Sequence, residues 1–133
     1  MALFEKYMLM TRGFQNVVED GKTVGFQIKI RITYYRGISL AVINGLEVTV
    51  DGKKYLPEQL RFSTGGHTFT LEEMGREEKV RWPFGEPATL TVLEPEGLKP
   101  GLHEVKLEEV IKPPYMPGRG FVAQFTRKMT LVA

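Results

Sequence analysis

The feature that most constrains the fold is an alternation of apolar and polar residues from Val24 to Tyr35. Successive side chains of a β-strand point to opposite faces, so this period of two predicts a long antiparallel strand with one face in a core and the other in water. Tyr34 then completes the core face, while Tyr35 lies outside it. The core face would carry Val24, Phe26, Ile28, Ile30, Ile32 and Tyr34, and the polar face Gln27, Lys29, Arg31, Thr33 and Tyr35.

Seven further segments show the same alternation over shorter lengths, and turn residues separate them. Asp20-Gly21, Asp51-Gly52 and Gly65-Gly66 mark hairpin turns. About eight short strands with turns every 8–12 residues or so predict an all-β fold, an antiparallel β-sandwich forming a single domain over residues 1–133. The further strands are Phe14–Val18, Leu46–Val50, Leu60–Phe62, His67–Leu71, Ala88–Val92, Leu102–Ile111 and Phe121–Val132.

One short helical turn is the only departure that the sequence predicts from an all-β chain. Thr70 and Glu73 have the spacing of a capping box, and Gly75 limits the helix to a turn or so. Trp82 lies between turn residues in RWPFGEP, and we expect it to anchor the core.

Composition excludes several classes of function. The net charge is +2 and acidic and basic residues are interspersed, so we expect no nucleic-acid partner. The chain has no cysteine, hence no disulfide or thiolate chemistry. Glu5 and Lys6 interrupt the apolar residues of the N-terminus, and no run approaches the ~18 apolar residues of a membrane span. We expect no signal peptide, no membrane partner and a cytoplasmic location.

Residues suited to catalysis are scarce. The two histidines, His67 and His103, are 36 positions apart and belong to no metal-binding motif. From their positions in the apolar–polar alternation of their strands, we predict that His67 is a packed or rim residue and that His103 is solvated. Ser39 and Ser63 lie in no nucleophile motif. We therefore predict no catalytic, cofactor-binding or metal-binding residue in this chain.

Two charged residues interrupt the apolar faces of the last two strands, Glu109 in one and Arg127 in the other. A β-bulge would turn one or both outward. A cross-strand ion pair would require a hairpin register centred on Gly118. Exposure near a sheet edge, where an inward charge discourages aggregation, is the third interpretation.

Exposed aromatic residues suggest binding to another chain. Tyr35 lies off the core phase and is followed by Arg36 and Gly37, while Tyr115 and Met116 lie in a stiff Pro/Gly-rich loop, KPPYMPGRGF. Tyr, Met and Arg are enriched at protein interfaces, so we predict that these five residues form a partner interface. Tyr115 and Met116 would alternatively fold back and cap the sandwich.

Five segments together resemble the β subunit of bacterial C-glycoside deglycosidases. They are KYMLMTRGFQNV, GFQIKIRITYYRGISL, LEVTVDGK, VRWPFGEPATLTV and PGLHEVKLE. The resemblance implies a small β-sandwich subunit in a hetero-oligomer with an α subunit that resembles a sugar-phosphate isomerase barrel. That partner would hold the acid–base residues and a divalent metal, expected to be manganese, whereas this chain would hold no cofactor.

The resemblance also implies a reaction. The complex would cleave the carbon–carbon bond between a 3-oxo sugar and an aromatic aglycone such as a flavonoid, with the 3-oxo C-glycoside bound mainly by the α subunit. Two other functions remain open. A β-sandwich with exposed aromatic residues is also typical of a carbohydrate-binding module, and a stand-alone hydrolase or lyase is the weakest alternative because acid, base and metal ligands do not converge in the sequence.

Overall fold

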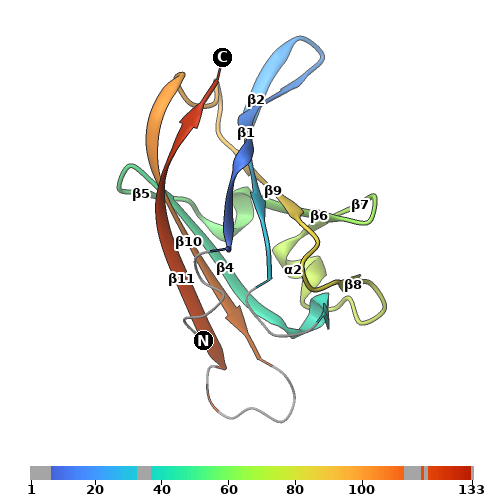
Figure 1. Cartoon of the computed structure of the whole chain (residues 1–133). Coiled ribbons are helices and arrows are strands. Elements are labelled where there is room, and N and C mark those ends of the chain that lie inside the picture. Colours follow the sequence, from blue (N-terminus) through green and yellow to red (C-terminus); the bar gives the residue numbers. More distant parts are fainter. Residues whose placement is uncertain (1–6, 33–36, 113–117, 119, 133) are drawn as a thin grey trace.

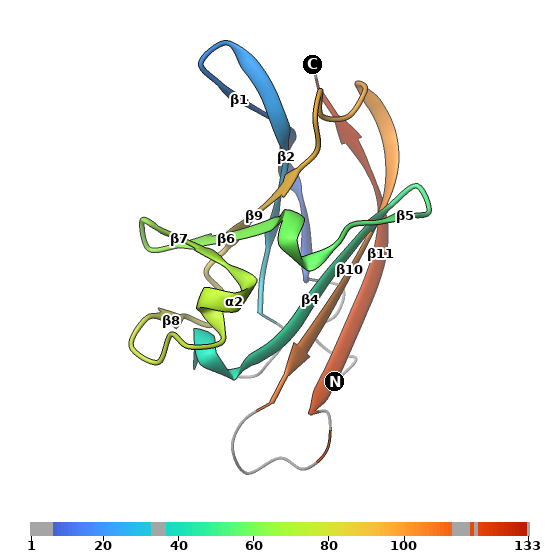
Figure 2. The same cartoon turned by 180° about the vertical axis from the view of Figure 1, so that it is seen from behind.

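A computed structural model describes residues 7–32, 37–112, 118 and 120–132. Two main sheets face each other, as opposite views of the chain show (Figure 1; Figure 2), and apolar side chains fill the space between them. The strand pairs in these residues are antiparallel. The predicted all-β class and antiparallel sandwich are therefore confirmed.

The first sheet has five strands in the spatial order β1 (Leu9–Glu19), β2 (Lys22–Ile30), β9 (Ala88–Leu93), β6 (Leu60–Thr64) and β7 (His67–Thr70). Asp20 and Gly21 connect β1 to β2 with φ angles of 50° and 77°, the left-handed conformation that a two-residue hairpin turn requires. The pairing of β1 with β2 is interrupted between Met10 and Gln15. This interruption makes β1 an irregular edge strand.

The second sheet has four strands in the order β11 (Phe121–Leu131), β10 (Gly101–Ile111), β4 (Ile43–Val50) and β5 (Lys53–Lys54). Asp51 and Gly52 form the turn between β4 and β5, with φ angles of 49° and 85°. Both Asp-Gly turns predicted from the sequence are thus confirmed. The edge strand β11 lies beside β1 of the first sheet on one side of the sandwich (Figure 1).

Short elements close the other side. The strands β3 (Ile38–Ser39) and β8 (Arg81–Trp82) pair with each other, and two 3-10 helices, η1 (Leu40–Val42) and η2 (Pro57–Gln59), lie in connections. The helix α2 (Leu71–Met74) begins with the predicted capping box: the Thr70 hydroxyl accepts from the Glu73 amide at 3.1 Å, and the Thr70 amide donates to the Glu73 carboxylate at 2.8 Å. The predicted helical turn is confirmed, while the two 3-10 helices are additional helical turns that the sequence did not predict.

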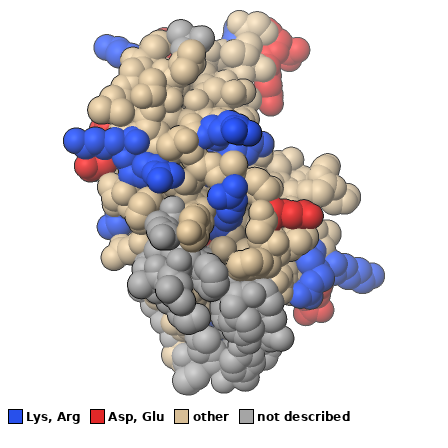
Figure 3. Space-filling view, viewed as in Figure 1, with Lys and Arg blue, Asp and Glu red and all other residues tan. Residues whose placement is uncertain are grey.

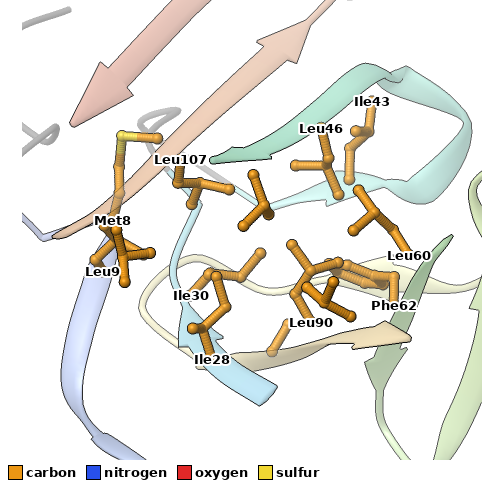
Figure 4. Close-up of a cluster of buried hydrophobic side chains, with 14 of the residues drawn as sticks. Met8, Leu9, Ile28, Ile30, Ile43, Leu46, Leu60, Phe62, Leu90 and Leu107 are labelled. Atoms are coloured by element: carbon orange, nitrogen blue, oxygen red, sulfur yellow. The ribbon is translucent and has the colours of Figure 1, made fainter. Parts of the chain in front are cut away.

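The core consists of side chains that the two sheets direct toward each other (Figure 4). Phe26, Ile28, Ile30 and Ile32 are buried, as the alternation predicts. The ring of Trp82 is fully buried, lies 5.0 Å from the ring of Phe62, and donates its indole N–H to the Glu86 carbonyl at 2.9 Å. Trp82 is therefore the predicted core anchor.

One glycine sets the spacing between two central strands. Gly25 of β2 is buried, and a Cβ atom at this position would lie 2.0 Å from the carbonyl oxygen of Val92 on β9. Two non-bonded heavy atoms do not approach so closely, so only glycine fits here.

The described residues contain eleven strands, of which three, β3, β5 and β8, are only two residues long. The other eight correspond one by one to the eight segments that the sequence predicts. Two residues are too few to display a period of two, which is why the short strands escape sequence analysis.

Of the three interpretations of Glu109 and Arg127, the cross-strand ion pair is wrong. The register of β10 and β11 places Glu109 opposite Ala123 and Arg127 opposite Val105, and it runs without a bulge from Gly101 to Ile111. The Glu109 side chain stays on the same face of β10 as the buried Val105 and Leu107, and Glu109 is 1% exposed. The bulge and the exposed-edge interpretations are therefore also wrong for this residue. Arg127 does lie on an edge strand, β11, as the sheet-edge interpretation requires.

Candidate functional site

The best-connected titratable group among the described residues is a histidine paired with a carboxylate. His103 is the histidine with a carboxylate partner: its Nδ1 lies 2.6 Å from Asp51 Oδ2, and its Nε2 lies 2.6 Å from the Lys99 carbonyl oxygen. Both neighbours are acceptors, so only the imidazolium, which donates from both nitrogens, satisfies them. The prediction that His103 is solvated is wrong, since its side chain is only 13% exposed.

The electrostatics of this pair agree with its geometry. Burial by itself would lower the pKa of His103, but the hydrogen bonds to the Lys99 carbonyl and the Asp51 carboxylate outweigh it and raise that pKa. The hydrogen bond from His103, together with the one from the Glu104 amide, lowers the pKa of Asp51. With both nitrogens occupied, His103 secures the β4–β5 turn and has no lone pair for general-base catalysis.

Tyr55 is also bound into the structure. Burial, followed by the neighbouring Glu94 carboxylate, raises the pKa of Tyr55 to about 12. His67 is exposed next to the β6–β7 turn, so the packed alternative predicted for it is wrong and the rim position stands. Among the described residues, no three His, Asp or Glu side chains lie close enough together to hold a metal ion. Nor is any helix of the described part long and apolar enough to cross a membrane.

Of the five residues predicted to form a partner interface, Tyr35, Arg36, Tyr115 and Met116 lie outside the described residues, as does Tyr34. Gly37 is described, and it packs against the backbone of β8 and the residues after it. A Cβ atom on Gly37 would lie 3.2 Å from the Trp82 carbonyl oxygen and 3.2 Å from Pro83 Cα. The Gly37 carbonyl also accepts a hydrogen bond from Arg81 at 2.9 Å. Gly37 itself is therefore tightly packed.

The most distinctive described surface lies where β1, the end of β2 and β11 meet. One open hollow of about 480 Å³ is lined by Arg12, Arg31 and Arg127, from three different segments, together with Tyr7, and no acidic residue is among the described residues that line it. On the face shown in Figure 3, Lys and Arg gather over these strands, and the acidic residues lie toward the edges.

An aromatic hollow adjoins these arginines. Tyr7 and Phe84, which are 50% and 47% exposed, line it together with Arg31, Ile32 and Gly85, and its volume is about 190 Å³. Tyr7 and Arg31 belong to both hollows. We refer to Tyr7, Arg12, Arg31, Phe84 and Arg127 together as the arginine–aromatic surface.

A third hollow, of about 430 Å³, lies between β4, the end of β10 and the helices η2 and α2. It carries Glu47, Glu72 and Glu108 beside apolar residues, and its lining, as far as the structure describes it, includes no basic residue. Its charge is thus opposite to that of the arginine–aromatic surface.

Sequence reasoning missed the arginine–aromatic surface although it recognised part of it. Arg31 was expected on the polar face of its strand, but nothing in the linear order connects it with Arg12 or with Arg127, 96 positions further along the chain. The local signal was a second aromatic residue, Phe84, two positions after Trp82 in a stretch of turn residues.

The fold and the site define a class of protein: a small β-sandwich with an exposed basic and aromatic surface, in whose described residues no three potential metal ligands lie together and His103 is bound on both ring nitrogens. Comparison with known proteins then identifies the family. Residues 4–115 match the family model of the C-glycoside deglycosidase beta subunit. The chain belongs to this family.

Individual relatives agree with this assignment. The C-glycoside deglycosidase beta subunit of Eubacterium cellulosolvens is 35% identical over 114 residues, which is 85% of this chain and 78% of that protein. The 3'-dehydrocarminate deglycosidase beta subunit of a Microbacterium species is 32% identical over 96 residues, or 72% of each chain. A C-glycoside deglycosidase beta subunit of Arthrobacter globiformis is 28% identical over 100 residues, covering 75% of this chain and 74% of the relative. A beta subunit is by its name part of a heteromeric enzyme, so the family supports a subunit role in an enzyme complex.

Proposed function

We propose that this chain is the non-catalytic β subunit of a heteromeric C-glycoside deglycosidase and that it supports a barrel-shaped α subunit. The observation that carries this proposal is the family match over most of the chain. The engagement of His103 on both ring nitrogens supports the non-catalytic part, because the best-placed candidate base is already used in the fold.

The proposed reaction is cleavage of the carbon–carbon bond between a 3-oxo sugar and an aromatic aglycone. The ketone acidifies the neighbouring C–H of the sugar, which makes loss of that proton and elimination of the aglycone feasible. The name of the Microbacterium relative refers to a 3'-dehydro compound, which supports an oxidised sugar as substrate.

The α subunit would contribute the acid–base residues and a divalent metal, expected to be manganese. The described residues of this chain do not fit such a metal, because they bring no three ligand side chains together. The interface with that subunit is still predicted to include Tyr35, Arg36, Gly37, Tyr115 and Met116. The cytoplasmic location also stays a prediction.

Co-expression with the candidate α subunit from the same genome tests the proposal. We expect a stable complex that cleaves a 3-oxo C-glycoside and an isolated β chain that does not. Turnover by the β chain alone, or normal turnover by the α subunit without it, would contradict the proposed role.

A carbohydrate-binding module remains the second candidate, because the half-exposed rings of Tyr7 and Phe84 border a shallow hollow where a sugar face could stack. Glycan binding by the lone chain, measured by calorimetry and lost in Phe84→Ala, together with no association with the α subunit, would favour this function.

A further inference from the structure

The arginines of the arginine–aromatic surface lie together without an acidic residue among the described residues that line their hollow. None of the three arginines forms an ion pair with any residue that the structure describes, whereas Lys53, Lys54 and Arg76 each pair with a carboxylate, at 2.9 Å, 3.1 Å and 3.5 Å. Three guanidinium groups that share one hollow without a carboxylate from its described lining leave their charge available to a partner.

Arg127 is held in place for binding. One guanidinium N–H donates to the Leu9 carbonyl of β1 at 2.9 Å, and the guanidinium lies 5.7 Å from the ring centre of Phe125. A guanidinium carries five N–H donors in a fixed plane, so this hydrogen bond orients the remaining donors. Ordering the side chain before a partner arrives lowers the entropic cost of association.

The position of the surface favours a large partner. It spans the gap between β1 and β11, the edge strands of two different sheets, and continues from a hollow of about 480 Å³ into one of about 190 Å³. One small anion would contact only part of this area. A nucleic acid is disfavoured because the net charge of the chain is only +2 and acids lie at the edges of this face.

The residue types fit a protein partner with carboxylates. Arg and Tyr are enriched among residues that dominate binding energy, and an arginine binds a carboxylate through two parallel hydrogen bonds. The rings of Tyr7 and Phe84 offer apolar area beside the charges. A partner that presents acidic side chains next to an apolar residue would match both halves of the surface.

We infer that the arginine–aromatic surface docks an acidic, apolar-centred region of the α subunit. This inference rests on the proposed function, since it takes the α subunit as the occupant. Arg12 and Arg31 would receive the carboxylates, Arg127 would fix the orientation, and Phe84 would supply the apolar contact.

The test compares two double charge reversals that change the net charge equally. Arg12→Glu/Arg31→Glu alters the proposed surface, whereas the control Arg76→Glu/Lys106→Glu alters the helix α2 end and the outer face of β10. Each lowers the formal net charge from +2 by four, to −2. Circular dichroism and Trp82 fluorescence verify folding before the affinity for the α subunit is measured by calorimetry at two salt concentrations.

We expect the Arg12→Glu/Arg31→Glu variant to raise the Kd for the α subunit at least tenfold and to lose most of the salt dependence that the wild type shows. The control variant should bind within threefold of the wild type. Phe84→Ala should weaken binding at least tenfold with an unchanged salt dependence, because it removes apolar contact and no charge.

The two proposals fail differently. If the wild-type chain does not bind the α subunit at all, the proposed function is wrong. If the wild type binds and Arg12→Glu/Arg31→Glu binds equally well, the complex stands and the docking surface is wrong. The docking surface is also wrong if that variant abolishes only self-association of the chain or only the binding of inorganic phosphate.

Discussion

His103 gives the chain a pH-dependent stability that can be measured in isolation from function. In the folded state its imidazolium donates to Asp51 and to the Lys99 carbonyl, and these contacts raise its pKa above the ordinary value of 6.5. A raised pKa means that the contribution to stability is fully present below about pH 6.5 and is lost as the pH rises through the folded-state pKa. The pKa of Asp51 is lowered from 3.8, so its contribution is present above that pH and is lost in acid.

The magnitude follows from the two hydrogen bonds and their exposure. A hydrogen bond that involves a charged group contributes about 1.5–3 kcal/mol when it is well shielded. The Asp51 side chain is 53% exposed and therefore screened by water, so we expect ~1–2 kcal/mol for the whole arrangement. For a chain of this length, each kcal/mol corresponds to a change in Tm of about 3–5 °C.

Thermal unfolding followed by Trp82 fluorescence from pH 5 to pH 9 provides the assay. The Tm of the wild type should fall as the pH rises, whereas His103→Gln should start lower at pH 5 and change less. The matched control is His67→Gln, which removes an exposed imidazole near the β6–β7 turn and should retain the wild-type pH dependence. If His103→Gln shows the same pH dependence as the wild type, the assignment of an imidazolium is wrong.

Three further changes test the packing and the register, each by urea unfolding. Gly25→Ala should cost about 3 kcal/mol or more because its Cβ would overlap a backbone carbonyl, whereas Gly45→Ala, whose Cβ would meet only a side chain at 3.7 Å, should cost less than about 1 kcal/mol. Thr70→Ala should cost about 1 kcal/mol through loss of the capping box. A double-mutant cycle on Glu109 and Arg127 should give a coupling below about 0.5 kcal/mol, because four strand positions separate them by about 13 Å; a larger value would contradict the register.

The sequence by itself determined the features that depend on a few neighbouring residues. The period of two placed Phe26, Ile28, Ile30 and Ile32 in the core because strand geometry fixes the direction of each side chain locally. The Asp-Gly turns and the capping box are equally local, since their residues satisfy backbone geometry within three or four positions. Resemblance along most of the chain also sufficed to indicate the family.

Only the tertiary structure decided what depends on pairing between distant segments. β10 pairs with β4 on one side and with β11 on the other, and the observed register places Glu109 opposite Ala123, so the register centred on Gly118 misplaced Glu109 relative to Arg127. His103 was predicted to be solvated because nothing near it in the sequence indicates a partner. Sheet pairing brings Asp51, 52 positions earlier, beside it. The arginine–aromatic surface likewise exists only because the edge strands of two sheets meet, and contacts across such an edge have no periodic signature in the sequence.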